Sequence, residues 1–196
     1  MMWDWQIIRR MELNKMNHFI GMEDQLCRVE GMVTVSAFKP GVIGRLMGFG
    51  MPLREAIQIA THAGRMKHQV KMHNLTTTSG RQFIARRISG QESAGLTYIA
   101  FGTGTTAPVV SDTQLVTETL RKALTECTQG DIYVYSSVFL LASECSFYIR
   151  EGGLFGGMAA SLTANSGSML CRFLVGYDNS VDQDDLTIQH TGEVML

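Results

Sequence analysis

The sequence predicts a mainly β fold with a few short helices, an α+β arrangement in which an extended N-terminal arm precedes an antiparallel β-sandwich or open barrel. Three observations predict it. From residue 96 onward, short β-branched or alternating runs are separated by turn residues at the spacing of sandwiches and barrels. Twenty glycines against three prolines indicate many turns. Apolar stripes with helical spacing occur, but they are short.

Composition and charge argue against several classes of partner. With 196 residues, the chain can bury a core as one large domain, or as one domain with an appended arm. Its net charge of −1 gives no electrostatic footprint for direct nucleic-acid or anionic-membrane binding. No apolar run is long enough to span a membrane, and the first ten residues lack the apolar core of a signal peptide. Charged residues make up only 18%, which hints that partners cover much of the surface.

Residues 1–30, Met1 to Glu30, are expected to form the N-terminal arm, and residues 31–196 the β-rich domain. The arm is rich in methionine, carries mixed charges and has no clean periodicity. We expect such a segment to become ordered only against neighbouring subunits.

Two strands are predicted in the first part of the domain. Met32 to Phe38 is rich in β-branched residues, and Lys39-Pro40-Gly41 ends it. Val42 to Met47 is a candidate to pair back onto this strand. A short strand is expected from His68 to Leu75.

Two helices are predicted in the same part, near residues 52–64 and 79–89. The first has Pro52 at its first turn, where a missing N–H costs nothing. Its apolar stripe has the i, i+3, i+4, i+7 spacing and consists of Leu53, Ala56, Ile57 and Ala60, with Gly64 as the C-terminal cap. Ser79 is the expected cap of the second helix.

The remaining chain is predicted to be almost wholly β. Gln129-Gly130-Asp131 is a hairpin signal between two strands. Ser111-Asp112-Thr113-Gln114 has the spacing of a capping box and predicts one or two helical turns. The predicted strands are residues 96–101, 122–128, 132–141, 145–150, 169–175 and 186–194.

The segment from Gly102 to Ala107 imitates the G-x-G-x-x-A fingerprint of dinucleotide-binding proteins, because it follows a predicted strand. We reject nucleotide binding for two reasons. Pro108 disfavours a helical conformation at Ala107, where the helix of the true motif is already under way. The strands that follow also favour an antiparallel hairpin over the parallel return of a βαβ unit.

Other patterns that carry chemistry are absent or weak. His68 and His73 lie five residues apart in a predicted strand, on opposite faces, so they are not expected to share a metal ion. The acidic turn with Asp182, Asp184 and Asp185 lacks the central glycine and oxygen spacing of a calcium loop, and we interpret it as a solvated turn. No catalytic motif is present. We therefore expect no enzyme activity, no cofactor and no metal.

The cysteines do not form a C-x-x-C motif, which is the spacing of metal and redox sites. They are Cys27, Cys127, Cys145 and Cys171. Buried or idle thiols are the favoured interpretation, and disulfides are the alternative.

Four ordered blocks, which together cover about residues 69–196, resemble small β-rich structural proteins of tailed bacteriophages. The blocks are His73 to Arg81, Leu96 to Glu118, Phe147 to Phe155 with its E-x-G-L-F pattern, and Asp185 to Thr191. In that pattern the third block is a strand, a turn and a second strand, and the last block is the closing strand. One departure is that the closing strand of the family carries tryptophan where this sequence has His190 or its neighbours.

The resemblance implies a structural component of a virion, in the tail, neck or baseplate. It would assemble in the host bacterial cytoplasm into a symmetric oligomer and act through contacts with other copies of itself and with other virion proteins. Capsid decoration and fibre anchoring are alternatives. An alternative from another class is a host-surface carbohydrate-binding β-sandwich module.

The residues of these blocks are expected to serve packing and assembly rather than catalysis. Glycines would supply positive φ, threonines would satisfy loop backbone groups, and a proline would fix the exit of the loop. A leucine would fix the short helix on the sheet, and the Leu-Phe pair would bury a loop end or fill a neighbouring subunit. The motif residues are Gly102, Thr103, Gly104, Pro108, Asp112, Leu115, Glu118, Glu151, Gly153, Leu154 and Phe155.

Overall fold

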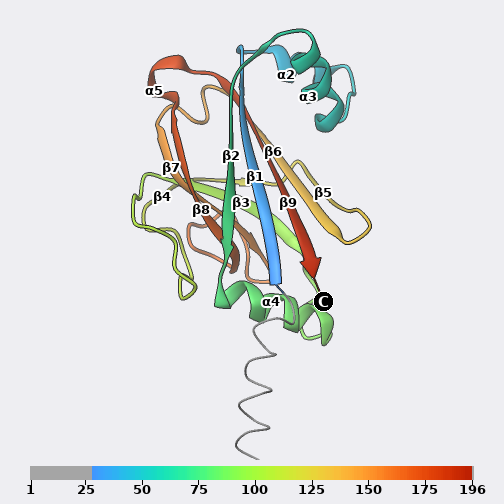
Figure 1. Cartoon of the computed structure of the whole chain (residues 1–196), viewed down its shortest axis with the longest axis vertical. Helices are drawn as coiled ribbons and strands as arrows, with labels where there is room; N and C mark the ends of the chain where they lie inside the picture. The colour runs from blue at the N-terminus through green and yellow to red at the C-terminus, as the bar shows by residue number, and fades with distance from the viewer. Residues whose placement is uncertain (1–27, 196) are drawn as a thin grey trace, which may run out of the picture.

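The computed structural model describes residues 28–195, and the side chains of residues 31–193. The described chain is mainly β, as predicted. Its strands form one antiparallel sheet that curls into a half-barrel (Figure 1). The strands are β1 Arg28–Phe38, β2 Met66–Thr76, β3 Leu96–Gly102, β4 Glu118–Ala123, β5 Glu126–Gln129, β6 Tyr133–Leu140, β7 Tyr148–Gly156, β8 Ser168–Asp178 and β9 Asp185–Met195. The helices are α2 Val42–Gly48, α3 Leu53–His62, α4 Thr78–Ile88 and α5 Asn179–Asp182.

The predicted arm, residues 1–30, lies outside the described residues as far as residue 27. Its last three residues belong to β1, which begins at Arg28 and pairs with β9 from there onward. The β-rich domain therefore begins three residues earlier than expected.

The strand order is β4-β3-β7-β8-β2-β1-β9-β6-β5, and β2 is the corner at which the sheet turns. Most of β2 pairs with β1, whereas only Leu75 and Thr76 pair with β8. The strands on either side of this corner face one another across the core (Figure 1).

The main core fills the concave side of the half-barrel. In β1 the alternation of the sequence places Val33, Val35 and Ala37 on this inner face, where each is at most 2% exposed. Leu154 of β7 and Phe173 of β8 face them from the other half of the sheet. Burial on one face fixes the register, because a one-residue slip would expose every apolar side chain of a strand.

Helices cover both ends of the half-barrel (Figure 1). The predicted stripe of the first helix is confirmed in α3, whose four apolar residues are buried in a second cluster together with Phe38 and Ile43. Residues 42–47 are not a returning strand but lie in α2, which packs in the same cluster. A segment of six residues is too short for the periodicity of its apolar side chains to separate strand from helix.

Helix α4 confirms the second predicted helix, but its N-terminal cap is Thr77 rather than Ser79. The Thr77 hydroxyl accepts a hydrogen bond from Gly80 N at 3.0 Å and donates one to the Met169 carbonyl at 2.6 Å. The cap therefore also fixes the helix on β8.

The strand predicted for residues 122–128 is divided between the two edges of the sheet. β4 and β5 stand at opposite ends of the strand order and are joined by Leu124 and Thr125. Leu124 N donates to Thr97 O at 2.9 Å, and Thr125 N donates to Ser137 O at 2.8 Å. These two residues connect the edges of the half-barrel at one point. The predicted hairpin around Gly130 is confirmed by the pairing of β5 with β6.

Candidate functional site

The buried carboxylate of Glu151 in β7 holds the loop of residues 103–117, which we call the clamp loop. The Glu151 side chain is fully buried. Its Oε1 atom accepts hydrogen bonds from Thr117 N at 2.7 Å and Gly104 N at 3.1 Å, and Oε2 accepts one from Val116 N at 3.1 Å. Backbone N–H groups that bond an ionised acceptor are among the stronger hydrogen bonds in proteins. One side chain thus fixes both ends of the loop.

The guanidinium group of Arg172 in β8 completes this arrangement. Its Nε and Nη2 atoms donate to Glu151 Oε2 at 3.0 and 2.8 Å. Nη1 donates to Asp112 Oδ2 at 2.7 Å, and Nη2 also donates to the Thr106 carbonyl at 2.8 Å. Arg172 is therefore a buried cation between two carboxylates and the clamp loop. We call Glu151, Arg172 and Asp112 the ionic clamp.

Asp112 does not cap a helix, although its surrounding sequence predicted one. Residues 111–114 form a turn and irregular chain. The same Oδ2 atom that binds Arg172 accepts a hydrogen bond from Val109 N at 2.9 Å. The capping-box pattern was wrong here because a buried arginine and a local turn both use the carboxylate.

Neither Gly102 nor Gly104 adopts the positive φ that was expected. Glycine is required at both positions because a side chain would collide with neighbouring atoms. A Cβ atom at Gly102 would overlap the Thr117 carbonyl oxygen, and one at Gly104 would overlap Glu151 Oε1. Both glycines thus lie against the residues that the clamp brings together. Their spacing of two, which imitates a nucleotide fingerprint, fits the alternation of an extended chain.

Leu115 anchors the clamp loop on the outer face of the sheet. It is 1% exposed and packs with Ala100, Phe155 and Met169. Gly153 makes room for it, because a Cβ there would lie 3.2 Å from Leu115 Cδ2 and 3.0 Å from the Cys171 carbonyl oxygen. Leu115 thus fixes a loop on the sheet, whereas the sequence predicted a short helix at this position.

The E-x-G-L-F block is one continuous strand rather than a strand, a turn and a second strand. Leu154 and Phe155 alternate across it, so Leu154 belongs to the inner core and Phe155 to the outer cluster. The Arg121 guanidinium lies 4.0 Å from the centre of the Phe155 ring and bonds both carboxylate oxygens of Glu118 at 2.7 and 2.8 Å. These residues pack within the chain and do not fill a neighbouring subunit.

The remaining motif residues have modest roles. Thr103 is exposed, and its N–H donates to the Thr117 carbonyl at 3.1 Å. Pro108 is half-buried in the clamp loop. Arg172, by contrast, was missed from the sequence, although it interrupts the apolar strand Met169 to Val175. A charged residue in such a run is a signal of a buried ion pair, since arginine is rarely buried without a partner.

The acidic turn is mostly buried, contrary to the solvated turn that was expected. Asp184 and Asp185 are 1% and 2% exposed, and only Asp182 faces solvent. The donors to Asp184 are the Tyr177 hydroxyl and the Lys67 ammonium group, at 2.8 Å each, and those to Asp185 are Gly41 N at 2.6 Å and Ala142 N at 3.1 Å. The two carboxylates thus fix neighbouring segments at the start of β9.

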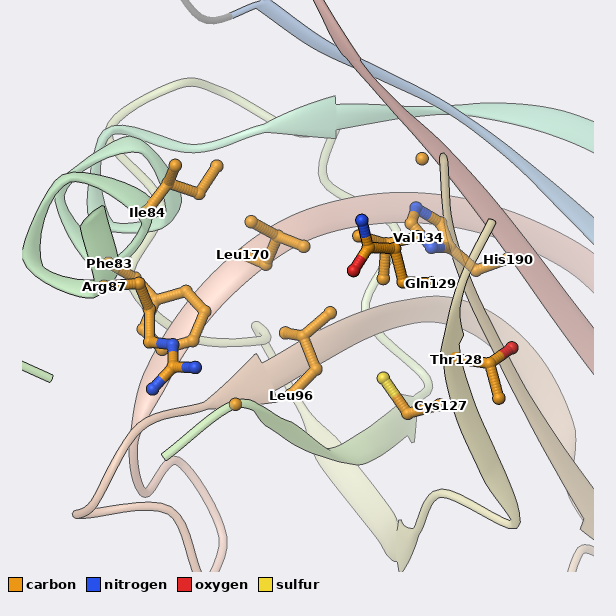
Figure 2. Close-up of a pocket in the computed structure, with 12 residues that line it drawn as sticks. Phe83, Ile84, Arg87, Leu96, Cys127, Thr128, Gln129, Val134, Leu170 and His190 are labelled. Carbon is orange, nitrogen blue, oxygen red and sulfur yellow. The ribbon is translucent and has the colours of Figure 1, made fainter. Parts of the chain in front are cut away.

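A second candidate site is an apolar pocket of about 280 Å³ inside the half-barrel. Figure 2 shows Phe83 of α4, Leu96 of β3 and Leu170 of β8 around it, with Cys127 of β5 and His190 of β9 on the opposite side. The lining is overwhelmingly apolar. Cys127, Cys145 and Cys171 are free, and Cys127 is exposed. Burial raises the pKa of all three thiols, to about 12 for Cys145 and Cys171. Cys27 lies outside the described residues.

His190 is the polar group of this pocket. It is 1% exposed, and its Nδ1 atom lies 3.5 Å from Ser136 Oγ. Its Nε2 atom has no hydrogen-bond partner, and the buried amide of Asn74 interacts with the Cys171 thiol. Both side chains border Gly31, where an added Cβ would overlap them. Burial lowers the pKa of His190 to about 4, so the imidazole is neutral at pH 7.

Acidification is expected to destabilise the fold through His190. Below pH 6.5 or so, the unfolded chain binds a proton that the folded protein does not bind until about pH 4. The stabilisation is therefore complete above this window and is lost as the pH falls through it, by about 2 kcal/mol between pH 7 and pH 5. Urea unfolding at the two pH values measures it. His190→Gln should remove most of the difference, and His73→Gln, at an exposed position, should retain it; equal differences in both variants would contradict the assignment.

The chain matches no protein-family model, no curated protein and no solved structure. In residues 28–195, no three His, Cys, Asp or Glu side chains are grouped so that they could hold a metal ion. Within the same range, no helix has the length and apolar character to cross a membrane.

Proposed function

We propose that this protein is a structural component of a tailed-bacteriophage particle, in the tail, neck or baseplate, and that it acts through subunit contacts. The proposal rests on the resemblance of the four sequence blocks. One structural observation supports it: buried polar residues of these blocks form hydrogen bonds and ion pairs within the chain and stabilise its own fold. Glu151 and Asp112 bind the clamp loop and Arg172 rather than facing a cleft.

Three of the four blocks meet at β8. In the first block, the Thr77 hydroxyl donates a hydrogen bond to the Met169 carbonyl, and Gly80 packs against the Leu170 carbonyl. The second and third are joined by Glu151, which pairs with Arg172 of β8. The fourth block lies in β9, in the other half of the sheet. Blocks that build one rigid unit are what an assembly subunit requires, because its interfaces depend on a fixed shape.

The outer face of the sheet also carries apolar side chains suited to subunit contact. Val116 of the clamp loop is 54% exposed, and Met158 and Leu162 of the loop of residues 157–167 are 65% and 67% exposed. The second loop contacts the first residue of β4, directly after the clamp loop, where Asn165 N donates to Glu118 Oε2 at 3.0 Å. Exposed apolar groups on adjoining loops are a feature of interaction surfaces.

A charge on this surface is expected to impair assembly without unfolding the protein. Met158→Asp and Leu162→Asp change exposed side chains, so each should alter the free energy of unfolding by no more than about 0.5 kcal/mol. A carboxylate buried in an interface should reduce incorporation at least roughly tenfold. Val181→Asp on α5, where the side chain is 83% exposed and lies at the far end, is the matched control.

The measurement is the number of copies in purified particles, obtained by quantitative mass spectrometry of phage that carry each variant. Normal incorporation of Met158→Asp and Leu162→Asp would show that these loops are not an interface. Absence of the unaltered protein from purified particles would contradict the proposed function itself.

A further inference from the structure

We propose that the apolar pocket of the half-barrel binds the chain's own N-terminal segment, residues 1–27, which inserts the side chain of Trp3 or Trp5. This inference does not depend on the proposed function. It rests on where the pocket lies, what it can accommodate and which residues the segment offers.

The pocket lies at the end of the sheet where the segment is attached. Gly192 lines the pocket and pairs with Gly31, three residues after Arg28, the first residue of β1. At about 3.3 Å per residue, Arg28 is therefore only about 10 Å along the strand from this part of the pocket. The 22 residues between Trp5 and Arg28 can span up to roughly 70 Å.

Attachment to the same chain favours the chain's own segment over a second copy. A covalent tether of this length gives an effective concentration of about the millimolar range, well above that of the protein in solution. β5, which lines the pocket with Cys127 to Gln129, is an edge strand, so one side of this strand has no neighbouring strand among the described residues. An extended segment can pair with such an edge.

The size of the pocket favours one large side chain over a separate small-molecule ligand. Its volume of about 280 Å³ lies at the small end of the range of about 300 to 1,000 Å³ that is usual for small-molecule sites, and one large side chain can fill much of it. Its walls include Phe83, Leu96 and Leu170, which suit an aromatic ring.

The polar chemistry of the pocket fits an indole. We assign the His190 proton to Nδ1, which faces Ser136 Oγ, so that the unpartnered Nε2 is an acceptor. The indole N–H is a donor only, and buried tryptophans generally use it in a hydrogen bond. The first eight residues contain both tryptophans of the chain, together with Met1, Met2, Ile7 and Ile8. An indole in the pocket would give the buried His190 nitrogen its missing partner.

Intrinsic fluorescence of the full chain tests this directly, because every tryptophan belongs to the segment. Native protein should emit at shorter wavelength than urea-unfolded protein and resist acrylamide quenching. Val134 lines the pocket as the cross-strand neighbour of Gly192. Val134→Phe should therefore shift the emission to longer wavelength and remove the protection from quenching. The matched control is Val181→Phe on α5, at the other end of the molecule. It should leave the emission wavelength and the acrylamide quenching unchanged. Far-ultraviolet circular dichroism confirms that each variant is folded.

A second readout is the alkylation rate of Cys127, the exposed thiol of the pocket, mapped by mass spectrometry. Trp3→Ser and Trp5→Ser leave the pocket unchanged, and the one that removes the inserted ring should accelerate alkylation. The proposal would be overturned if the tryptophans of the native protein had the same emission wavelength and acrylamide quenching as in urea. It would also be overturned if neither Trp3→Ser nor Trp5→Ser changed the alkylation rate of Cys127. Protection that disappears on dilution would show that a second copy supplies the segment, and would overturn the assignment to the same chain.

Discussion

Glu151→Gln is expected to lower the free energy of unfolding by about 3 kcal/mol, because it removes the fully buried one of the two carboxylates that pair with Arg172 and leaves this buried charge with the partly exposed Asp112. The neutral amide also weakens the three backbone hydrogen bonds that hold the clamp loop, and its NH₂ group cannot accept any of them. Urea unfolding measures the loss. Amide hydrogen exchange should accelerate first at Val116 and Thr117, because the loop is released before the sheet unfolds.

The matched control is Glu144→Gln, the same chemical change in the partly exposed ion pair with Lys122, where a loss of no more than about 1 kcal/mol is expected. Combining Glu151→Gln with Arg172→Met should restore part of the stability, because the buried Arg172 charge that has lost its Glu151 partner is then removed as well. A loss below about 1 kcal/mol in the single variant would show that the ionic clamp does not stabilise the fold.

Gly80→Ala is expected to destabilise the protein by about 3 kcal/mol, although alanine is the better helix former. Gly80 lies in the first turn of α4, where a Cβ atom would overlap the carbonyl oxygen of Leu170 in β8. That oxygen cannot move freely, because it accepts the hydrogen bond from Thr77 N at 3.1 Å. The helix would have to separate from the strand on which it is fixed.

Gly48→Ala provides the control, since Gly48 is also helical but has nothing within 4 Å of an added Cβ. This variant should be more stable by about 0.5 to 1 kcal/mol. The two substitutions are chemically identical, so opposite signs of the change in thermal unfolding would isolate the contact with β8. A stabilised Gly80→Ala variant would contradict the close approach of helix and strand.

The sequence predicted the class of the fold because one face of most strands is buried, which leaves an alternating pattern such as that of Val33, Val35 and Ala37. It failed where tertiary contacts decide the conformation. Val42 to Met47 is helical because it packs with Phe38 and α3. Residues 122–128 form two strands because Leu124 and Thr125 cross between sheet edges, which local sequence does not encode.

The motif residues around Glu151 were predicted to serve packing and assembly, but the ionic clamp that unites them was not predicted. Arg172 lies 21 residues from Glu151 and 60 from Asp112, so their contacts depend on the register that pairs Gly153 with Arg172. Positive φ was expected at Gly102 and Gly104, whereas the actual constraints are the Thr117 carbonyl oxygen beside Gly102 and the Glu151 carboxylate beside Gly104. The pocket and its histidine could not be predicted, since their residues come from six separate elements and the adjoining loops.

The position of β9 has a consequence for how the protein is made. Strands β1 and β9 lie side by side within the sheet, with Arg28 to Phe38 paired to Met195 to Asp185 over eleven residues. β6 also depends on β9 for its inner neighbour. During synthesis, β1 leaves the ribosome long before β9 exists, and without β9 the strands β6 and β5 have no partner through which to pair with β1. Because pairing over so long a sequence separation is slow, folding is completed only after translation of residues 185–195, and the exposed edge of β1 must avoid other strands until then.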